Sequence, residues 1–134
     1  MNFDVTQFEL QDTAVLTVQN AKGDDDLLVD GQPVRITLYG TGSAQFAKAE
    51  HRAVNAATAR MQAAFRGKPT KNASEISATE LAEKLAACTA HIENFPIDGG
   101  ALALYSNNRL AYIRKQVVKF LEDDANFSKG SATS

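Results

Sequence analysis

The stretch GDDDLLVDGQPVRITLYGTGS, from Gly23 to Ser43, contains the signals that decide the fold. In VRITLY (34–39) apolar and polar residues alternate, which predicts a strand with one buried face. Asp30-Gly31 supplies the left-handed backbone of a hairpin turn between LLV (27–29) and this strand. Because the strand ends in glycines that are followed by a serine, the next segment is expected to begin a helix.

The flanking segments extend this pattern in both directions. AVLTV (14–18) predicts a further strand before the stretch. After it, nine of the 21 residues from Ala44 to Ala64 are alanine, the best helix former, which predicts a long helix. A capping box at Ser77 and an apolar stripe that runs to Ile92 predict a second helix. A third is expected after Asn107 or Asn108, with an apolar stripe that ends at Phe120.

These elements predict a single α+β domain over residues 1–127. It consists of a small N-terminal antiparallel β-hairpin or sheet followed by about three α-helices. The strands are grouped before the helices and do not alternate with them, which favours α+β over α/β. Residues 128–134 are small and polar, and we expect them to form a flexible C-terminal tail.

Composition excludes several classes of function. The 134 residues are 44% hydrophobic and 22% charged, which is typical of one globular domain. A net charge of -2 provides no overall positive field for nucleic acid. No apolar run is long enough to span a bilayer, and the first residues lack the pattern of a secretion signal. The single cysteine, Cys88, cannot form an intramolecular disulfide. We therefore expect a cytosolic protein that binds no membrane.

Three consecutive aspartates, Asp24 to Asp26, suggest a calcium loop, but their spacing does not fit one. An EF-hand loop that began at Asp26 would have Leu28 at its third position and Thr37 at its twelfth, so two ligands are missing. We interpret the aspartates as a solvated turn that keeps a strand edge from pairing with other chains.

The sequence Gly40-Thr41-Gly42-Ser43 could hold a phosphate, since a turn from strand to helix leaves backbone N–H groups free. Gln45 stands where a dinucleotide fingerprint needs its third glycine, and the Gly-Lys-Ser/Thr of a P-loop is missing here. The end of a strand followed by a serine N-cap of a helix produces the same residue pattern, and we favour that structural interpretation.

The remaining chemistry-bearing residues do not form a recognisable site. Cys88 and His91 lie three residues apart in the second expected helix, but a stable zinc site needs three or four ligands. His51 lies on another helix, and the chain has no nucleophile elbow. The acidic run at 122–124 fits a helix end in water. We therefore expect no catalytic residue, no metal and no cofactor, and we classify the chain as a non-enzyme.

Four basic residues give the last expected helix a charged side: Arg109, Arg114, Lys115 and Lys119. No ladder of aromatic residues accompanies them, so we favour a solvated helix face over a nucleic-acid site. A small DNA-binding regulator stays open as an alternative.

The alanine-rich segment carries few large apolar residues. Each alanine buries little area, so a helix of this composition gains modest stability from packing within its own chain. We expect other helices to complete its surface, and we hypothesise that Ala44–Phe65 packs against a neighbouring subunit of a homo-oligomer.

The chain also resembles a known family. DGQPVRITLYGTGSAQF (30–46) resembles a strand pair followed by a helix that is common in small proteins of tailed bacteriophages and prophages. LAACTAHIENFPIDGGAL (85–102), YSNNRLAYI (105–113) and QVVKFLEDDANF (116–127) fit the same pattern. In order and spacing, residues 28–127 resemble the tail assembly chaperones of long-tailed phages. The family often has a tryptophan near the exit of the second helix, and this chain has none.

The resemblance implies a non-enzymatic chaperone in the host bacterial cytoplasm. Such chaperones coat the tape-measure protein before the tail tube polymerises around it, and they then leave. In these families a longer product is often made by ribosomal frameshifting near the end of the short form. The candidate contact residues are members of the helical stripes, and core packing stays open as the alternative for each of them: Phe46, Val54, Met61, Phe120 and Phe127.

Other functions compete with this one. A structural tail component would have the same properties and would stay in the virion. A small nucleotide-binding enzyme would use the turn at Gly40–Ser43, and a DNA-binding protein would use the basic side of the last helix.

Overall fold

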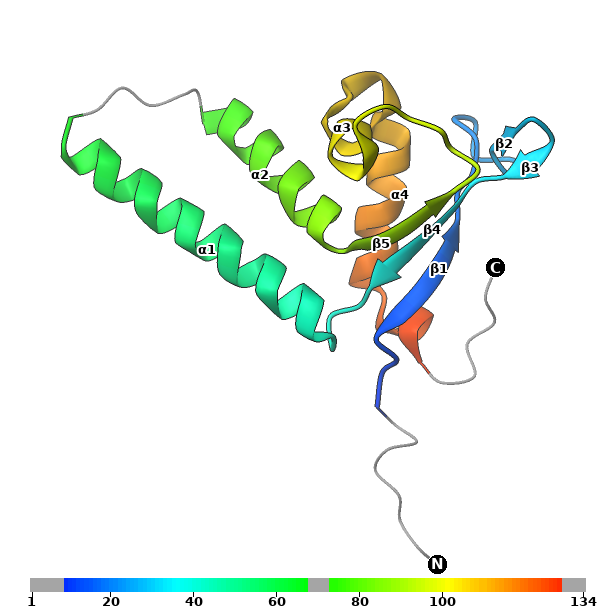
Figure 1. The fold of residues 1–134 in the computed structure, drawn as a ribbon, viewed down its shortest axis with the longest axis horizontal. Helices are drawn as coiled ribbons and strands as arrows, with labels where there is room; N and C mark the ends of the chain where they lie inside the picture. The colour runs from blue at the N-terminus through cyan, green and yellow to red at the C-terminus, as the bar shows by residue number, and fades with distance from the viewer. Residues whose placement is uncertain (1–8, 68–72, 129–134) are drawn as a thin grey trace, which may run out of the picture.

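A computed structural model describes residues 9–67 and 73–128 of the chain (Figure 1). Strands β1 (Thr13–Thr17), β4 (Arg35–Tyr39) and β5 (Thr89–Glu93) form an antiparallel sheet in the order β1-β4-β5. The short strands β2 (Leu28–Val29) and β3 (Gln32–Pro33) form a separate hairpin. The helices are α1 (Ala44–Phe65), α2 (Ala73–Ala87), α3 (Gly100–Ser106) and α4 (Ala111–Glu122), with 3-10 turns η2 (Asn108–Leu110) and η3 (Asp124–Phe127). The predicted α+β class is confirmed.

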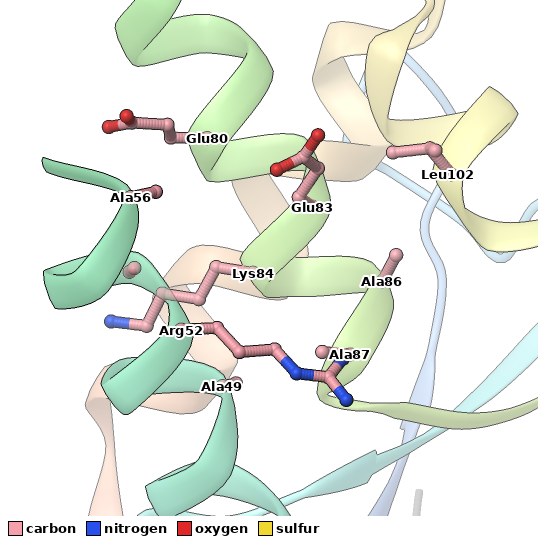
Figure 2. A pocket seen from close by; sticks show the side chains of 10 residues that line it. Ala49, Arg52, Ala56, Glu80, Glu83, Lys84, Ala86, Ala87 and Leu102 are labelled. Carbon is pink, nitrogen blue, oxygen red and sulfur yellow. The ribbon is translucent and has the colours of Figure 1, made fainter. Parts of the chain in front are cut away.

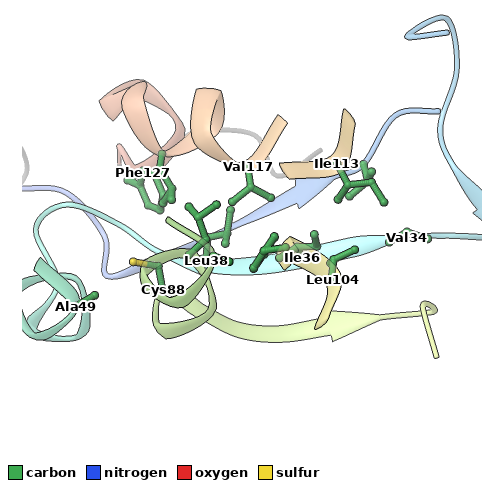
Figure 3. Packing of buried hydrophobic residues seen from close by; sticks show 14 residues of the cluster. Val34, Ile36, Leu38, Ala49, Cys88, Leu104, Ile113, Val117 and Phe127 are labelled. Carbon is green, nitrogen blue, oxygen red and sulfur yellow. The ribbon is translucent and has the colours of Figure 1, made fainter. Parts of the chain in front are cut away.

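One face of the sheet forms the core. Ile36 in the central strand lies opposite Leu16 of β1 and Ile92 of β5, so the three apolar side chains share a face. The inner side of α4, with Ile113 and Val117 one turn apart, is buried with them (Figure 3). The alternation in VRITLY thus specifies the buried face, as the sequence predicts.

The turn at Asp30-Gly31 has the predicted conformation. Leu28 pairs with Pro33 and Val29 with Gln32, which leaves a two-residue loop. Asp30 has φ 52° and Gly31 has φ 79°, the positive values that a type I′ hairpin turn needs at both positions. After Pro33 the chain leaves this hairpin and continues into β4, which pairs with β1 and β5 and not with β2.

The second helix is shorter than predicted at its C-terminal end. α2 ends at Ala87, and Thr89–Glu93 forms the edge strand β5, so the predicted continuation to Ile92 is wrong. The physical reason is tertiary: β4 has a free edge that β5 pairs with, and Ile92 then lies opposite Ile36. α2 also begins at Ala73, so Ser77 lies inside the helix and is not its N-cap. Propensity alone cannot report a pairing partner such as Ile36, which lies 56 positions before Ile92.

The C-terminal end of the described chain completes the core. The 3-10 turn η3 folds Phe127 back onto the sheet, where its ring lies against Gly40 and is fully buried. Ser128, the first residue of the predicted tail, forms a bridge with Leu10. The rest of that tail, 129–134, lies outside the described residues.

Helices α1 and α2 lie side by side and project from the sheet (Figure 1), and we call this pair the helical arm. Two ion pairs link them: Arg60 with Glu80, and Glu50 Oε1 with Lys84 Nζ at 3.6 Å. Of the 22 residues of α1, Ala49 alone is buried. None of the described helices has both the length and the hydropathy that crossing a bilayer requires.

Candidate interaction surface on the helical arm

A row of exposed side chains runs along α1. Its members follow one another at intervals of four and three residues, and we call them the α1 stripe: Ala47, His51, Val54, Thr58, Met61 and Phe65. Val54 and Met61 are each 62% exposed, and Phe65 is 87% exposed. Because burying one such side chain contributes about 1.5–3 kcal/mol, burial of these three residues against a partner would contribute to binding.

The opposite side of α1 explains why the stripe points away from the rest of the chain. Ala49, Ala53 and Ala56 lie on that side, at helical spacing, and line a surface that α2 shares. Two ion pairs, Arg60 with Glu80 and Glu50 with Lys84, join α1 to α2 on this side. The small side chains of α1 therefore face α2 and α3, while Val54, Met61 and Phe65 lie on the opposite, exposed side.

A pocket of about 340 Å³ lies between the two helices of the arm and α3 (Figure 2). Alanines of α1 and α2 line it together with Leu102 of α3, and Arg52, Glu80, Glu83 and Lys84 border it. Glu80 and Lys84 already form ion pairs with α1. These two charges therefore join the helices, and the rest of the lining combines alanine methyls and Leu102 with the charged side chains of Arg52 and Glu83.

The glycine-rich turn before α1 is a helix cap. The Ser43 hydroxyl donates to Gly40 O at 2.7 Å and accepts from Phe46 N at 3.1 Å. The side chain is 3% exposed, and Phe127 covers the turn at Gly40. Both hydrogen-bonding roles of the hydroxyl are thus used within the fold, which supports the structural interpretation of this turn.

Replacing Ser43 with alanine is expected to lower the free energy of unfolding by about 1–2 kcal/mol. The substitution removes the cap of α1 and the bond to Gly40 O. Thr41→Ala, in the same turn, removes only a solvent-exposed bond of 3.2 Å from the Thr41 hydroxyl to Asp124 Oδ1, and it should change the value by about 0.5 kcal/mol or less. Urea denaturation of both variants measures the difference, and equal losses would contradict the capping role.

The candidate metal ligands do not converge. Cys88 is buried at the end of α2, whereas His91 lies on β5, exposed, with its Nε2 atom 3.9 Å from Glu93 Oε1. The prediction that both lie on one helix face is wrong, because the chain changes from helix to strand between them. The Asp24 and Asp25 carboxylates accept bonds within their own turn, from Asn20 Nδ2 and Asp26 N. Over residues 9–67 and 73–128, no cluster of three or more His, Cys, Asp or Glu could hold a metal.

Two buried groups have raised pKa values. Burial raises the pKa of the Cys88 thiol from its ordinary value of 9.0 to about 11. Burial also raises the pKa of Tyr105 from 10.0 to about 12, although its hydroxyl lies 2.8 Å from Thr89 Oγ1. Since a thiolate is the reactive form of cysteine, burial and the raised pKa both disfavour reaction of the Cys88 thiol at neutral pH.

The stability of the fold should therefore fall in alkaline solution. The unfolded chain releases the thiol proton above about pH 9, whereas the folded chain holds it until about 11, so unfolding is favoured as pH rises between these values. For Cys88 the expected slope is up to about 1.4 kcal/mol per pH unit. Urea denaturation from pH 8 to 11 should give a shallower slope for Cys88→Ala. Identical slopes would show that burial of the thiol makes no such contribution.

The structure places the other candidate contact residues closer to the core. Phe46 is half-buried, with Lys84 Nζ 5.3 Å from its ring centre. Phe120 is half-buried and packs edge-on against Phe127, with ring centres 5.5 Å apart. Phe127 is part of the core and is not accessible to a partner in this conformation. Val54 and Met61 are exposed, as the surface interpretation of these residues requires.

Phe65 belongs to the α1 stripe and is missing from the predicted contacts. Its spacing of four residues from Met61 is visible in the sequence, and it is the most exposed large apolar residue among those described. The basic residues of α4 are not all free, since Arg114 Nη1 donates to Tyr105 O at 2.9 Å.

Comparison of the chain with protein-family models, with curated proteins and with solved structures finds no match. The fold and the stripe therefore define the chain as an α+β protein with a projecting helical arm.

Proposed function

We propose that the chain is a non-enzymatic tail assembly chaperone that binds the tape-measure protein of a long-tailed phage in the host bacterial cytoplasm. The observation that supports this most is the exposure of Val54, Met61 and Phe65 along one side of a projecting helix. Large apolar side chains that are exposed together on one side of a helix are typical of an interaction surface. The resemblance of residues 28–127 to the chaperone family supplies the identity of the client.

The spacing of the stripe suits a helical client. Val54, Met61 and Phe65 are separated by seven and four residues, the intervals at which one helix presents anchors to another. Ala47 and Thr58 leave gaps between the larger side chains, into which apolar side chains of a client helix can insert. With few large anchors, the contact is modest and reversible, as a chaperone that leaves its client requires.

Co-expression with the tape-measure protein tests the proposal. We expect the client to be insoluble alone and to copurify with this chain as a soluble complex. Mass spectrometry of purified phage particles should then find the chain missing, because a chaperone leaves before the tail is complete. A client that stays insoluble would contradict the proposal, and many copies in the particle would indicate a retained tail component.

A further inference from the structure

We infer that the helical arm opens: α1 swings away from α2 as an intact helix, attached at its N-terminal end, while α2 stays packed on the rest of the fold. The opening follows from the contacts within the chain. Its use, which is to expose the alanine side of α1 to a client helix, rests on the proposed function.

The contact of α1 with the rest of the chain buries little apolar surface. Ala49 is the one buried residue among its 22. Ala53, Ala57 and Ala63 are half-buried, and each alanine removes only a small apolar area from water. A pocket of about 340 Å³ lies between α1, α2 and α3, so these helices do not fill the space between them (Figure 2). Segments with few buried apolar contacts open at a low cost in free energy.

Two ion pairs connect α1 to α2, and we call them the arm ion pairs. One joins Arg60 to Glu80, and the other joins Glu50 Oε1 to Lys84 Nζ at 3.6 Å. The four side chains are between 27% and 56% exposed, so water and dissolved ions reach them. Ion pairs with this exposure are weak, and salt screens them. The closed arm should therefore become less stable as the ionic strength rises.

α2 is anchored where α1 is not. Its Ala82 and Leu85 side chains are buried, and the helix continues through Cys88 into β5. At this junction the Tyr105 hydroxyl of α3 lies 2.8 Å from Thr89 Oγ1, which donates to Leu85 O at 2.8 Å. α2 therefore stays with the sheet and α3, and the helix that moves is α1.

The N-terminal end of α1 is its point of attachment. The Ser43 hydroxyl caps the helix by accepting from Phe46 N, and Phe46 and Ala49 contact the core. Beyond Ala49 no residue of α1 is buried. The far part of the helix, about 24 Å from Ala49 to Phe65, is therefore the part that separates from α2.

The composition of α1 allows the separated helix to persist. Nine of the 21 residues from Ala44 to Ala64 are alanine, and α1 contains no glycine or proline. Alanine has the highest intrinsic helix propensity, and 22 residues exceed the about 12–15 at which isolated helices are marginal. The alanine content thus gives α1 a stability that does not depend on α2. Opening then exposes a side of small residues that a second helix can approach closely.

Distances between two spin labels test the opening. The labels are attached at Ala59→Cys and Thr79→Cys, two exposed positions on α1 and α2, in a chain that also carries Cys88→Ala. From 20 mM to 1 M NaCl, the population with a longer distance should rise about 3- to 10-fold, because salt screens the arm ion pairs. The helix content measured by circular dichroism should stay the same. One narrow distance at both salt concentrations, or a loss of helix content, would overturn the inference.

Two matched variants of the labelled chain test the arm ion pairs. Glu50→Gln with Glu80→Gln removes both pairs, so the longer distance should be populated at 20 mM NaCl and should depend little on salt. Glu83→Gln with Glu122→Gln removes the same charge outside the arm ion pairs and should behave like the chain without these changes. Equal populations of the longer distance in the two variants would overturn the role of the ion pairs.

A cross-link across the arm tests whether opening serves the client. Arg60→Cys and Glu80→Cys, again with Cys88→Ala, replace the partners of one arm ion pair, and a short bis-thiol reagent then holds the arm closed. The cross-linked chain should solubilise at least about 3-fold less tape-measure protein than the same variant without the reagent, because it offers the α1 stripe but not the alanine side. Equal solubilisation would overturn the link between opening and the client. If neither form solubilises the client, the proposed function fails, and the spin-label distances still decide whether the arm opens.

Discussion

Replacing Phe127 with alanine is expected to lower the free energy of unfolding by about 3–5 kcal/mol. The ring is fully buried, lies against Gly40, and packs edge-on against Phe120. Its removal leaves a cavity between η3 and the sheet that the backbone of β4 cannot fill. Since domains of this size are stable by only about 5–15 kcal/mol, the variant should be close to unfolding. Urea denaturation followed by circular dichroism measures the change.

Gly40 is the second half of the same contact. A Cβ atom added at position 40 would lie 2.5 Å from Cδ1 of Phe127, closer than real side chains approach. Because the ring is enclosed, Gly40→Ala should cost about 1–3 kcal/mol or more. In the Phe127→Ala background the same methyl group has room, so the second substitution should cost much less there. Additive losses would contradict the packing of the ring on this glycine.

The largest functional effect is expected from a variant that places three carboxylates in the α1 stripe. Val54→Glu, Met61→Glu and Phe65→Glu together should abolish copurification of the tape-measure protein. A client helix would have to bury three charges in place of three apolar anchors. The fold should tolerate the changes, because all three side chains are exposed and each surface substitution changes stability by about 0.5 kcal/mol or less.

A matched control separates the stripe from general charge effects. Gln45→Glu, Asn55→Glu and Ala59→Glu add three carboxylates at exposed positions of α1 that lie outside the stripe. This variant should keep the client soluble, and circular dichroism should show that both variants are folded. Equal loss of the client in both variants would indicate that added charge on α1, and not the loss of apolar anchors, releases it.

Local signals in the sequence predict much of the fold. The Asp-Gly turn needs positive φ at two residues, and the alternation of VRITLY needs one buried face, so both can be read without knowledge of the rest of the chain. The boundaries of α1 also follow from its own composition. These features depend on neighbouring residues alone.

Features that depend on distant residues could not be predicted in this way. β5 becomes a strand because β4 offers it an edge, although its sequence continues the apolar stripe of α2. Phe127 follows an apparent helix end, yet η3 turns it back onto Gly40, 87 positions earlier in the sequence. For the same reason, the sequence could list Phe46, Val54, Met61, Phe120 and Phe127 as candidates but could not separate exposed residues from core residues.

Site-specific photo-cross-linking tests most directly whether the α1 stripe binds the client. A photoreactive amino acid in place of Met61 should form an adduct with the tape-measure protein in the soluble complex, and the same group in place of Ala59 should form little. The two positions lie on different sides of one helix, so expression and folding are matched. Adducts from position 61 alone are the predicted result. Equal adducts from both positions, or adducts from position 59 alone, would contradict the account.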